Sequence, residues 1–179
     1  MLELVIAPDP IYKNICTPVV IVDDAIRTTL DAMMETVKAY DALGISAPMV
    51  GLTQRLIALS LEDEAGVLHQ YKMVNPVVTE RSQQLNTMEE GSITFLGVTA
   101  PVTRPAEVTV SYLDEHGVSQ SIHANGILAV CLQHEIDYLN VKTFLDYQPA
   151  MKRDILKRKM EKQKRLGPLP HVHGAHCNH

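Results

Sequence analysis

The chain has 179 residues, of which 46% are hydrophobic and 21% are charged. This length fits one domain, and the composition excludes a mainly disordered chain because it offers enough apolar surface to offset chain entropy. No apolar run approaches the ~20 residues that span a bilayer. The first ten residues do not match a signal peptide. Three cysteines, far apart and odd in number, indicate a reducing compartment. We therefore expect a cytoplasmic protein that contacts no membrane.

The formal net charge of −5 hides an asymmetry along the chain. Eight of the 16 Lys and Arg residues lie between Lys152 and Arg165. The rest of the chain holds 8 basic and 19 acidic residues, a charge of −11. An acidic body with one short basic segment gives no reason to expect DNA as a partner.

Hydrophobic spacing predicts the elements in chain order. Asp23 and Asp24 precede apolar residues at helical spacing, which predicts a helix with a capping carboxylate at its start and Gly44 at its end. Residues 55–61, 67–74, 107–112 and 118–123 are predicted strands, with a hairpin turn at 114–117. Residues 127–139 predict a buried helix, and 151–166 predict a basic helix. This order indicates an α+β domain over residues 1–166, followed by a flexible tail over 167–179.

A His–Glu pair lies on the predicted buried helix, in the segment QHEIDY at 133–138. Residues four apart share a helix face, so His134 and Tyr138 would point at one spot. A histidine at position 138 would complete a motif with two metal ligands and a glutamate base. Because position 138 holds a tyrosine, this segment by itself is more typical of a structural histidine. Such a histidine forms a hydrogen bond within the face through which the helix packs.

Two further segments reverse that interpretation: ALGISAPM at 42–49 and EGSIT at 90–94. In order and spacing, the three segments resemble the G-x-G-x-A-A-x-Q, E-G-C-L-S and Q-H-E-x-D-H-L signatures of the peptide deformylases. Residues 73–76, Arg104, Asp114 and 144–146 also match that family. The resemblance extends to about Arg165. It implies antiparallel or mixed sheets around a central helix that carries His134 and Glu135, and a basic C-terminal helix.

The resemblance also implies a chemistry. Deformylases remove the formyl group from the N-terminal methionine of new proteins, using a divalent metal (Fe, Ni or Zn). The metal is held by the Cys of the second motif and both His of the third, and it lowers the pKa of its bound water to about 7. The Glu beside the first His moves the proton. The Gln of the first motif and a backbone N–H after the Cys stabilise the oxyanion.

Residue by residue, much of this machinery is replaced. Ser92 stands in place of the Cys ligand, Tyr138 in place of the second His, and Met49 in place of the oxyanion Gln. His134 and Glu135 remain as one ligand and the base, and Ile93 supplies the backbone N–H. Each zinc ligand supplies on the order of 3 kcal/mol, so losing two weakens binding by on the order of 10⁴. Losing an oxyanion donor costs a further ~10²–10³ in rate. We expect no cofactor in the cleft and no ordinary deformylase activity.

The replaced ligands allow two interpretations. Ser92, His134 and Tyr138 would be a hard, oxygen-rich set suited to ferric iron. Alternatively, Tyr138 fills the space of the metal and hydrogen-bonds Ser92 or Glu135, because a buried phenol usually finds a partner. We favour the second.

The methionine pocket is less altered. By resemblance, its lining includes His134 and seven further residues: Leu43, Gly44, Glu90, Gly91, Ile127, Val130 and Cys131. A packed helix would bury such residues in any case. They can therefore be either a methionine pocket or ordinary helix core, and both interpretations stand. Cys131 is more typical of a small buried hydrophobe than of a nucleophile.

Both C-terminal segments suggest partners. By resemblance, the basic helix from Lys152 to Arg165 docks on the ribosome through RNA phosphates, and a solvated surface helix is the alternative. The tail holds five potential metal ligands in nine residues and suits weak binding of nickel, zinc or copper. These are His171, His173, His176, Cys177 and His179.

The function we favour is non-catalytic: a deformylase-like protein that binds N-terminal (formyl)methionyl peptides or the ribosome. One alternative is an active or weakly active deformylase, or a hydrolase of another N-acyl amide, with a rebuilt metal site. Another is a metal-handling protein that acts through the histidine-rich tail.

Overall fold

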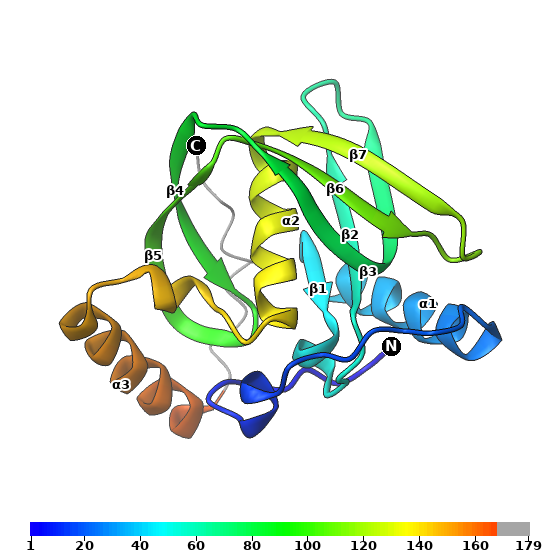
Figure 1. Ribbon diagram of the computed structural model, residues 1–179. Coiled ribbons are helices and arrows are strands. Elements are labelled where there is room, and N and C mark those ends of the chain that lie inside the picture. Colours follow the sequence, from blue (N-terminus) through cyan, green and yellow to red (C-terminus); the bar gives the residue numbers. More distant parts are fainter. Residues whose placement is uncertain (168–179) are drawn as a thin grey trace.

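The structure, a computed structural model that describes residues 1–167, confirms the predicted α+β fold (Figure 1). Helix α2 (Gly126–Leu139) lies between a five-stranded sheet and a two-stranded sheet. Ten of its fourteen residues are buried, because both sheets cover it. Among residues 1–167, no helix combines the length and the apolar character needed to cross a membrane.

The larger sheet has the order β1-β2-β3-β6-β7, and each neighbouring pair is antiparallel. Its strands are β1 (Gly44–Ser46), β2 (Leu56–Glu62), β3 (Leu68–Arg81), β6 (Glu107–Leu113) and β7 (Ser119–Asn125). Four of the five match predicted strands, and β1 was not predicted. Strand β3 continues well past the predicted end at residue 74, through register shifts that bend it. The predicted turn at 114–117 is confirmed by the Gly117 N–H, which donates to the Asp114 carbonyl over 3.0 Å.

The smaller sheet was not predicted. It pairs β4 (Leu85–Ser92) with β5 (Phe95–Pro105), so the segment at 90–94 spans the end of β4 and the turn that leads into β5. Strand β4 is mostly exposed and polar, so it shows no hydrophobic alternation. Strand β5 does alternate, but Pro101 and Pro105 argue against a strand in the sequence.

Helix α1 (Asp24–Ala39) begins as predicted, with the Asp23 carboxylate accepting a hydrogen bond from the Ile26 N–H over 3.0 Å. Its end was predicted wrongly. The helix stops at Ala39, Asp41 adopts a φ of 50°, and Gly44 instead opens β1. Gly44 is needed there because a Cβ atom would lie 2.4 Å from Leu59 Cδ2 and 3.2 Å from Glu135 Cγ.

Helix α3 (Ala150–Leu166) confirms the predicted basic helix and packs on β5. Met160 is its one buried residue, and Lys164 Nζ donates to the carbonyls of Ile6 and Pro8 over 2.7 Å each. Most of its other cations are exposed. Three short 3-10 helices were not predicted: η1 (Pro10–Lys13), η2 (Ala47–Val50) and η3 (Phe144–Tyr147).

The predicted tail falls outside the described residues from position 168 onward. The division into a domain and a tail, and metal binding by the tail, therefore stay predictions.

Candidate functional site

His134 is held in a fixed orientation at the centre of the molecule. Its Nδ1 lies 2.8 Å from Oε2 of Glu90, a buried residue on β4. Its ring stacks on Phe144 of η3 and meets the Tyr138 ring edge-on, with centroids 5.9 and 5.1 Å away. A carboxylate on one imidazole nitrogen orients the ring in the way seen for metal-binding histidines. The structure thus brings together Glu90 and His134, which are 44 positions apart in the chain.

Glu90 also belongs to a buried charge network. Arg104 on β5 donates from Nε and Nη2 to the two carboxylate oxygens of Glu90, over 2.7 and 2.9 Å. Its Nη1 donates to Asp137 Oδ2 over 2.8 Å, and the Tyr147 hydroxyl donates to the same oxygen over 2.7 Å. Burial raises the pKa of Glu90, but hydrogen bonds and charge from Arg104 and His134 more than offset this, so the pKa is lowered.

Tyr138 lies where the resemblance implies the second histidine. Its ring is almost fully covered and contacts those of Tyr12 and Phe95, with centroids 5.9 and 5.7 Å away. Burial raises the pKa of this phenol well above its usual value, the charge of Glu135 raises it further, and the Ser92 hydroxyl opposes the rise. The phenol therefore keeps its proton at neutral pH.

Of the hydrogen bonds predicted for Tyr138, the one with Ser92 is present only as a close contact. Although Ser92 lies near enough to influence its pKa, the Tyr138 hydroxyl makes no hydrogen bond of normal geometry with any described residue. The Ser92 hydroxyl instead lies 3.1 Å from that of Thr94 and accepts from the Thr94 N–H over 3.3 Å. Thr94, in the turn between β4 and β5, thus supplies the hydrogen-bond partners of the Ser92 hydroxyl.

Two further buried oxygens in residues 1–167 lack a hydrogen-bond partner: Glu135 Oε2 and Ser46 Oγ. Burial raises the pKa of Glu135, with an added contribution from the charge of Glu90, while His134 and Ser46 oppose the rise. A buried carboxyl with an unsatisfied oxygen strongly favours its neutral form.

A divalent metal does not fit these donors. Where the resemblance implies a thiol and an imidazole, Ser92 and Tyr138 offer an alcohol and a phenol, which are neutral and far less acidic or basic than the groups they replace. Among residues 1–167, no group of three His, Cys, Asp or Glu side chains is placed to hold a metal ion. His134 is thus one oriented ligand without the two partners that the resemblance implies.

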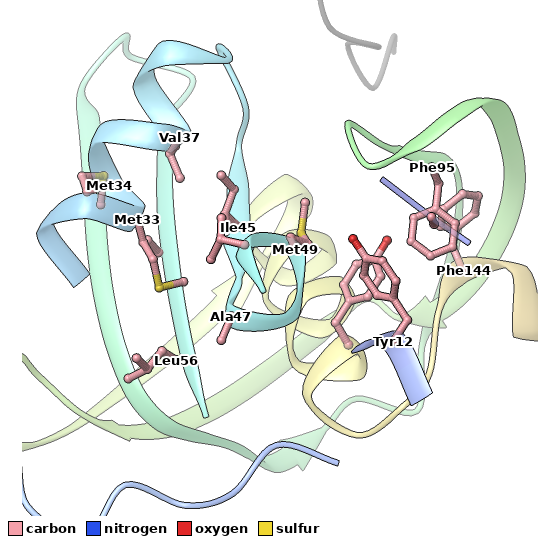
Figure 2. Close-up of a cluster of buried hydrophobic side chains, with 14 of the residues drawn as sticks. Tyr12, Met33, Met34, Val37, Ile45, Ala47, Met49, Leu56, Phe95 and Phe144 are labelled. Carbon is pink, nitrogen blue, oxygen red and sulfur yellow. The ribbon is translucent and has the colours of Figure 1, made fainter. Parts of the chain in front are cut away.

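Met49 lies on η2 and is nearly inaccessible to solvent. Figure 2 shows it between the aliphatic side chains of α1, β1 and β2 and the aromatic rings of Tyr12, Phe95 and Phe144. A thioether donates no hydrogen bond, so this position packs the core rather than stabilising an oxyanion. Ile93, in the turn after β4, packs partly buried against the same core.

The predicted pocket residues lie around one edge of α2. Ile127, Val130, Cys131 and His134 follow at i, i+3, i+4 and i+7 and so share a helix face. Ile127 is half-buried, so this face reaches the surface at the start of α2. Glu90 lies beneath this face, and its carboxylate is hydrogen-bonded to Arg104 and His134. The roles of these residues in peptide binding stay predictions.

Sequence reasoning missed several residues of the site. Phe144 stacks on His134, Tyr12 packs against Tyr138, and Asp137 and Tyr147 hold Arg104. Asp137, in the segment at 133–138, and Phe144, in the matching residues 144–146, were the two with a signal in the sequence. Tyr12 had none, because the N-terminal segment is irregular apart from η1.

A buried central helix with a His–Glu pair, enclosed by one large and one small antiparallel sheet, is the architecture of a peptide deformylase. A family profile described as polypeptide deformylase matches residues 1–154, and the chain belongs to this family. A peptide deformylase-like protein of Rickettsia conorii is 41% identical over 177 residues, which cover 99% of this chain and 96% of that protein. A peptide deformylase of Rhizobium meliloti is 38% identical over 159 residues, 89% and 91% of the two chains.

Solved structures agree with this assignment. The crystal structure of a peptide deformylase from Ehrlichia chaffeensis matches with a TM-score of 0.88 and 34% identity, covering 93% of this chain and 98% of that one. The structure described as the Ehrlichia enzyme in complex with actinonin matches with a TM-score of 0.87 and 35% identity, covering 92% and 98%.

The first prediction concerns the buried ion pair. Arg104→Gln leaves Glu90 and Asp137 without their counter-charge, and we expect a loss of about 3–5 kcal/mol in the free energy of unfolding. Arg27→Gln is the control, because its pair with Asp24 is exposed and contributes about 1 kcal/mol or less. Urea denaturation of both variants measures the difference. Equal losses would contradict a structural role for the network.

The second prediction concerns Glu135. Because its folded pKa is raised, the unfolded chain ionises first, and the wild-type protein loses stability as pH rises above the unfolded value near ~4.3. Glu135→Gln removes this loss. We expect it to stabilise the protein at pH 7 by about 1 kcal/mol or more, with a gain that vanishes toward pH ~4. The exposed Glu64→Gln variant should stay within about 0.5 kcal/mol at every pH. A Glu135→Gln gain that does not change with pH would refute this account.

Proposed function

We propose that this protein binds N-terminal methionyl peptides in the deformylase cleft without hydrolysing the formyl group by the metal-dependent route of its family. The observation that carries the proposal is the ring of Tyr138, which meets the His134 ring at 5.1 Å in the place where the resemblance implies a second imidazole ligand. A neutral phenol lacks the basic nitrogen with which an imidazole binds a divalent metal.

Peptide recognition requires less than catalysis. The face formed by Ile127, Val130 and Cys131 offers apolar contact for a methionine side chain, and the resemblance implies that Leu43, which is 37% exposed, lies at its edge. Apolar burial contributes about 25 cal/mol per Å² whether or not a metal lies nearby. The ordered Glu90–His134 pair supplies polar groups at the inner end of this face.

The experiment measures binding and cleavage separately. Isothermal titration with formyl-Met-Ala-Ser, Met-Ala-Ser and Ala-Ala-Ser should show binding of the two methionyl peptides only. Formate release should equal that of the buffer. Leu43→Lys should weaken methionyl binding, because it places a charge at the pocket edge, whereas Val118→Lys at the remote β6–β7 turn should not. Peptide binding that ignores methionine would refute the proposal, as would steady formate release.

A gain-of-function variant tests why hydrolysis is lost. Ser92→Cys, Tyr138→His and Met49→Gln together restore the donors that the resemblance implies. We expect this triple variant to bind one equivalent of iron or nickel and to release formate. The Tyr138→Phe variant is its control, because it removes the phenol without adding a ligand, and it should release none. Formate release by Tyr138→Phe would point to a route independent of these three positions.

A further inference from the structure

A cavity of about 400 Å³ lies on the face of α2 that points away from His134 and Tyr138. Gln133, Ile136, Asp137 and Asn140 line it, and their i, i+3, i+4, i+7 spacing places them on one helix face. Its remaining walls come from Arg55 just before β2, from β3 and β5, and from the segment after α2. None of Ser92, Glu135 and Tyr138 contributes to this cavity, so it is distinct from the candidate site.

Positive charge gathers in this cavity. Only eight Lys and Arg residues lie outside α3, and four of them line it: Arg55, Arg81, Arg104 and Lys142. Asp137 is the one acidic residue in the lining, and it is already paired with Arg104. The body also holds 19 acidic residues, and cations spread evenly over its surface would not gather around one cavity in this way.

Three of the four cations have no carboxylate partner. Among the described residues, no Asp or Glu lies within ion-pair distance of Arg55, Arg81 or Lys142. Arg55 donates to Asn140 Oδ1 over 2.8 Å and to the Pro76 carbonyl over 3.3 Å, two bonds from a group with five N–H donors. These bonds hold the guanidinium in place while donors remain for a ligand.

Tyr147 brings two of the cations together. Its ring lies 4.6 Å from Arg104 Cζ and 4.0 Å from Lys142 Nζ. Lys142 follows Val141, which adopts a φ of 59°, an outlier for a β-branched residue. The chain thus turns sharply after α2 and places an ammonium group at the cavity, on the aromatic ring that Arg104 also contacts.

We propose that this cavity binds a small phosphate-bearing molecule. A phosphate group carries about −1.5 to −2 charges at pH 7 and accepts the paired donors of a guanidinium, which suits a lining with three unpaired cations. Val77, Val78 and Ile136 form an apolar wall for the carbon body of the ligand. The volume falls within the range of about 300–1,000 Å³ typical of small-molecule sites. This inference does not rest on the proposed peptide binding.

The test uses AMP and pyrophosphate as probes of the full-length protein, by isothermal titration. The cavity variant Arg55→Gln, Arg81→Gln, Lys142→Gln should weaken the binding of both by about tenfold or more, since it removes charge-assisted hydrogen bonds. The matched control is Lys157→Gln, Arg158→Gln, Lys159→Gln, which removes the same charge from the exposed face of α3 and should change affinity less than about twofold. Adenosine should not bind measurably.

Four results would overturn the proposal: no binding of either probe to the wild-type protein, equal losses in the two triple variants, adenosine binding as tightly as AMP, or malonate binding as tightly as pyrophosphate. The last would assign the cavity to carboxylates. If the cavity variant fails to fold, the double variant Arg81→Gln, Lys142→Gln replaces it, because both side chains are exposed. Its matched control is the double variant Lys157→Gln, Arg158→Gln.

Discussion

The ion pair between Arg104 and Glu90 fixes the geometry on which the rest of the site depends. The two residues come from the paired strands of the smaller sheet, and both are almost fully buried. Arg104 reaches Asp137 and Glu90 reaches His134, so one network ties this sheet to two turns of α2. Because a single missing partner would leave a buried charge uncompensated, the sheet and the helix can take only one relative position. The orientation of the His134 ring follows from that position.

The network separates two regions with different chemistry. On one side, Tyr138, Glu135 and Ser46 present buried oxygens without hydrogen-bond partners around an oriented histidine. This side retains the frame of a deformylase site, with Ser92 and Tyr138 in place of the thiol and imidazole that the resemblance implies. On the other side, Arg104 faces a hollow where Arg55 and Lys142 lack acidic partners. The same guanidinium therefore supports the candidate site and contributes charge to the proposed phosphate site.

The sequence predicted the elements whose periodicity is strong. Helices α1, α2 and α3 and four strands of the larger sheet have one apolar face or a fully buried run, and each begins close to its predicted start, although the ends of α1 and β3 differ. Strands β4 and β5 were missed because exposed polar residues and two prolines conceal them. The contact of Glu90 with His134 and the cluster of cations behind α2 depend on residues far apart in the chain. No local pattern encodes such contacts, and only the family resemblance pointed toward the first.

The hydrogen bond expected for Tyr138 illustrates the same limit. The spacing correctly placed His134 and Tyr138 on one helix face, and their rings are in contact. Whether the phenol finds a partner depends on the path of the turn at Ser92, where Thr94 satisfies the serine first. That outcome is a property of tertiary packing, which side-chain chemistry alone does not determine.

Metal content tests the central claim most directly. Elemental mass spectrometry should be applied to the full-length protein with the tail ligands His171, His173, His176, Cys177 and His179 replaced by alanine, after anaerobic incubation with iron, nickel and zinc. These replacements prevent metal on the tail from being counted as metal in the cleft. Because His134 has no further His, Cys, Asp or Glu partners placed to hold a metal among residues 1–167, we expect no metal above that of a Tyr138→Phe control treated in the same way. One tightly held equivalent of metal, lost on His134→Ala, would contradict the account.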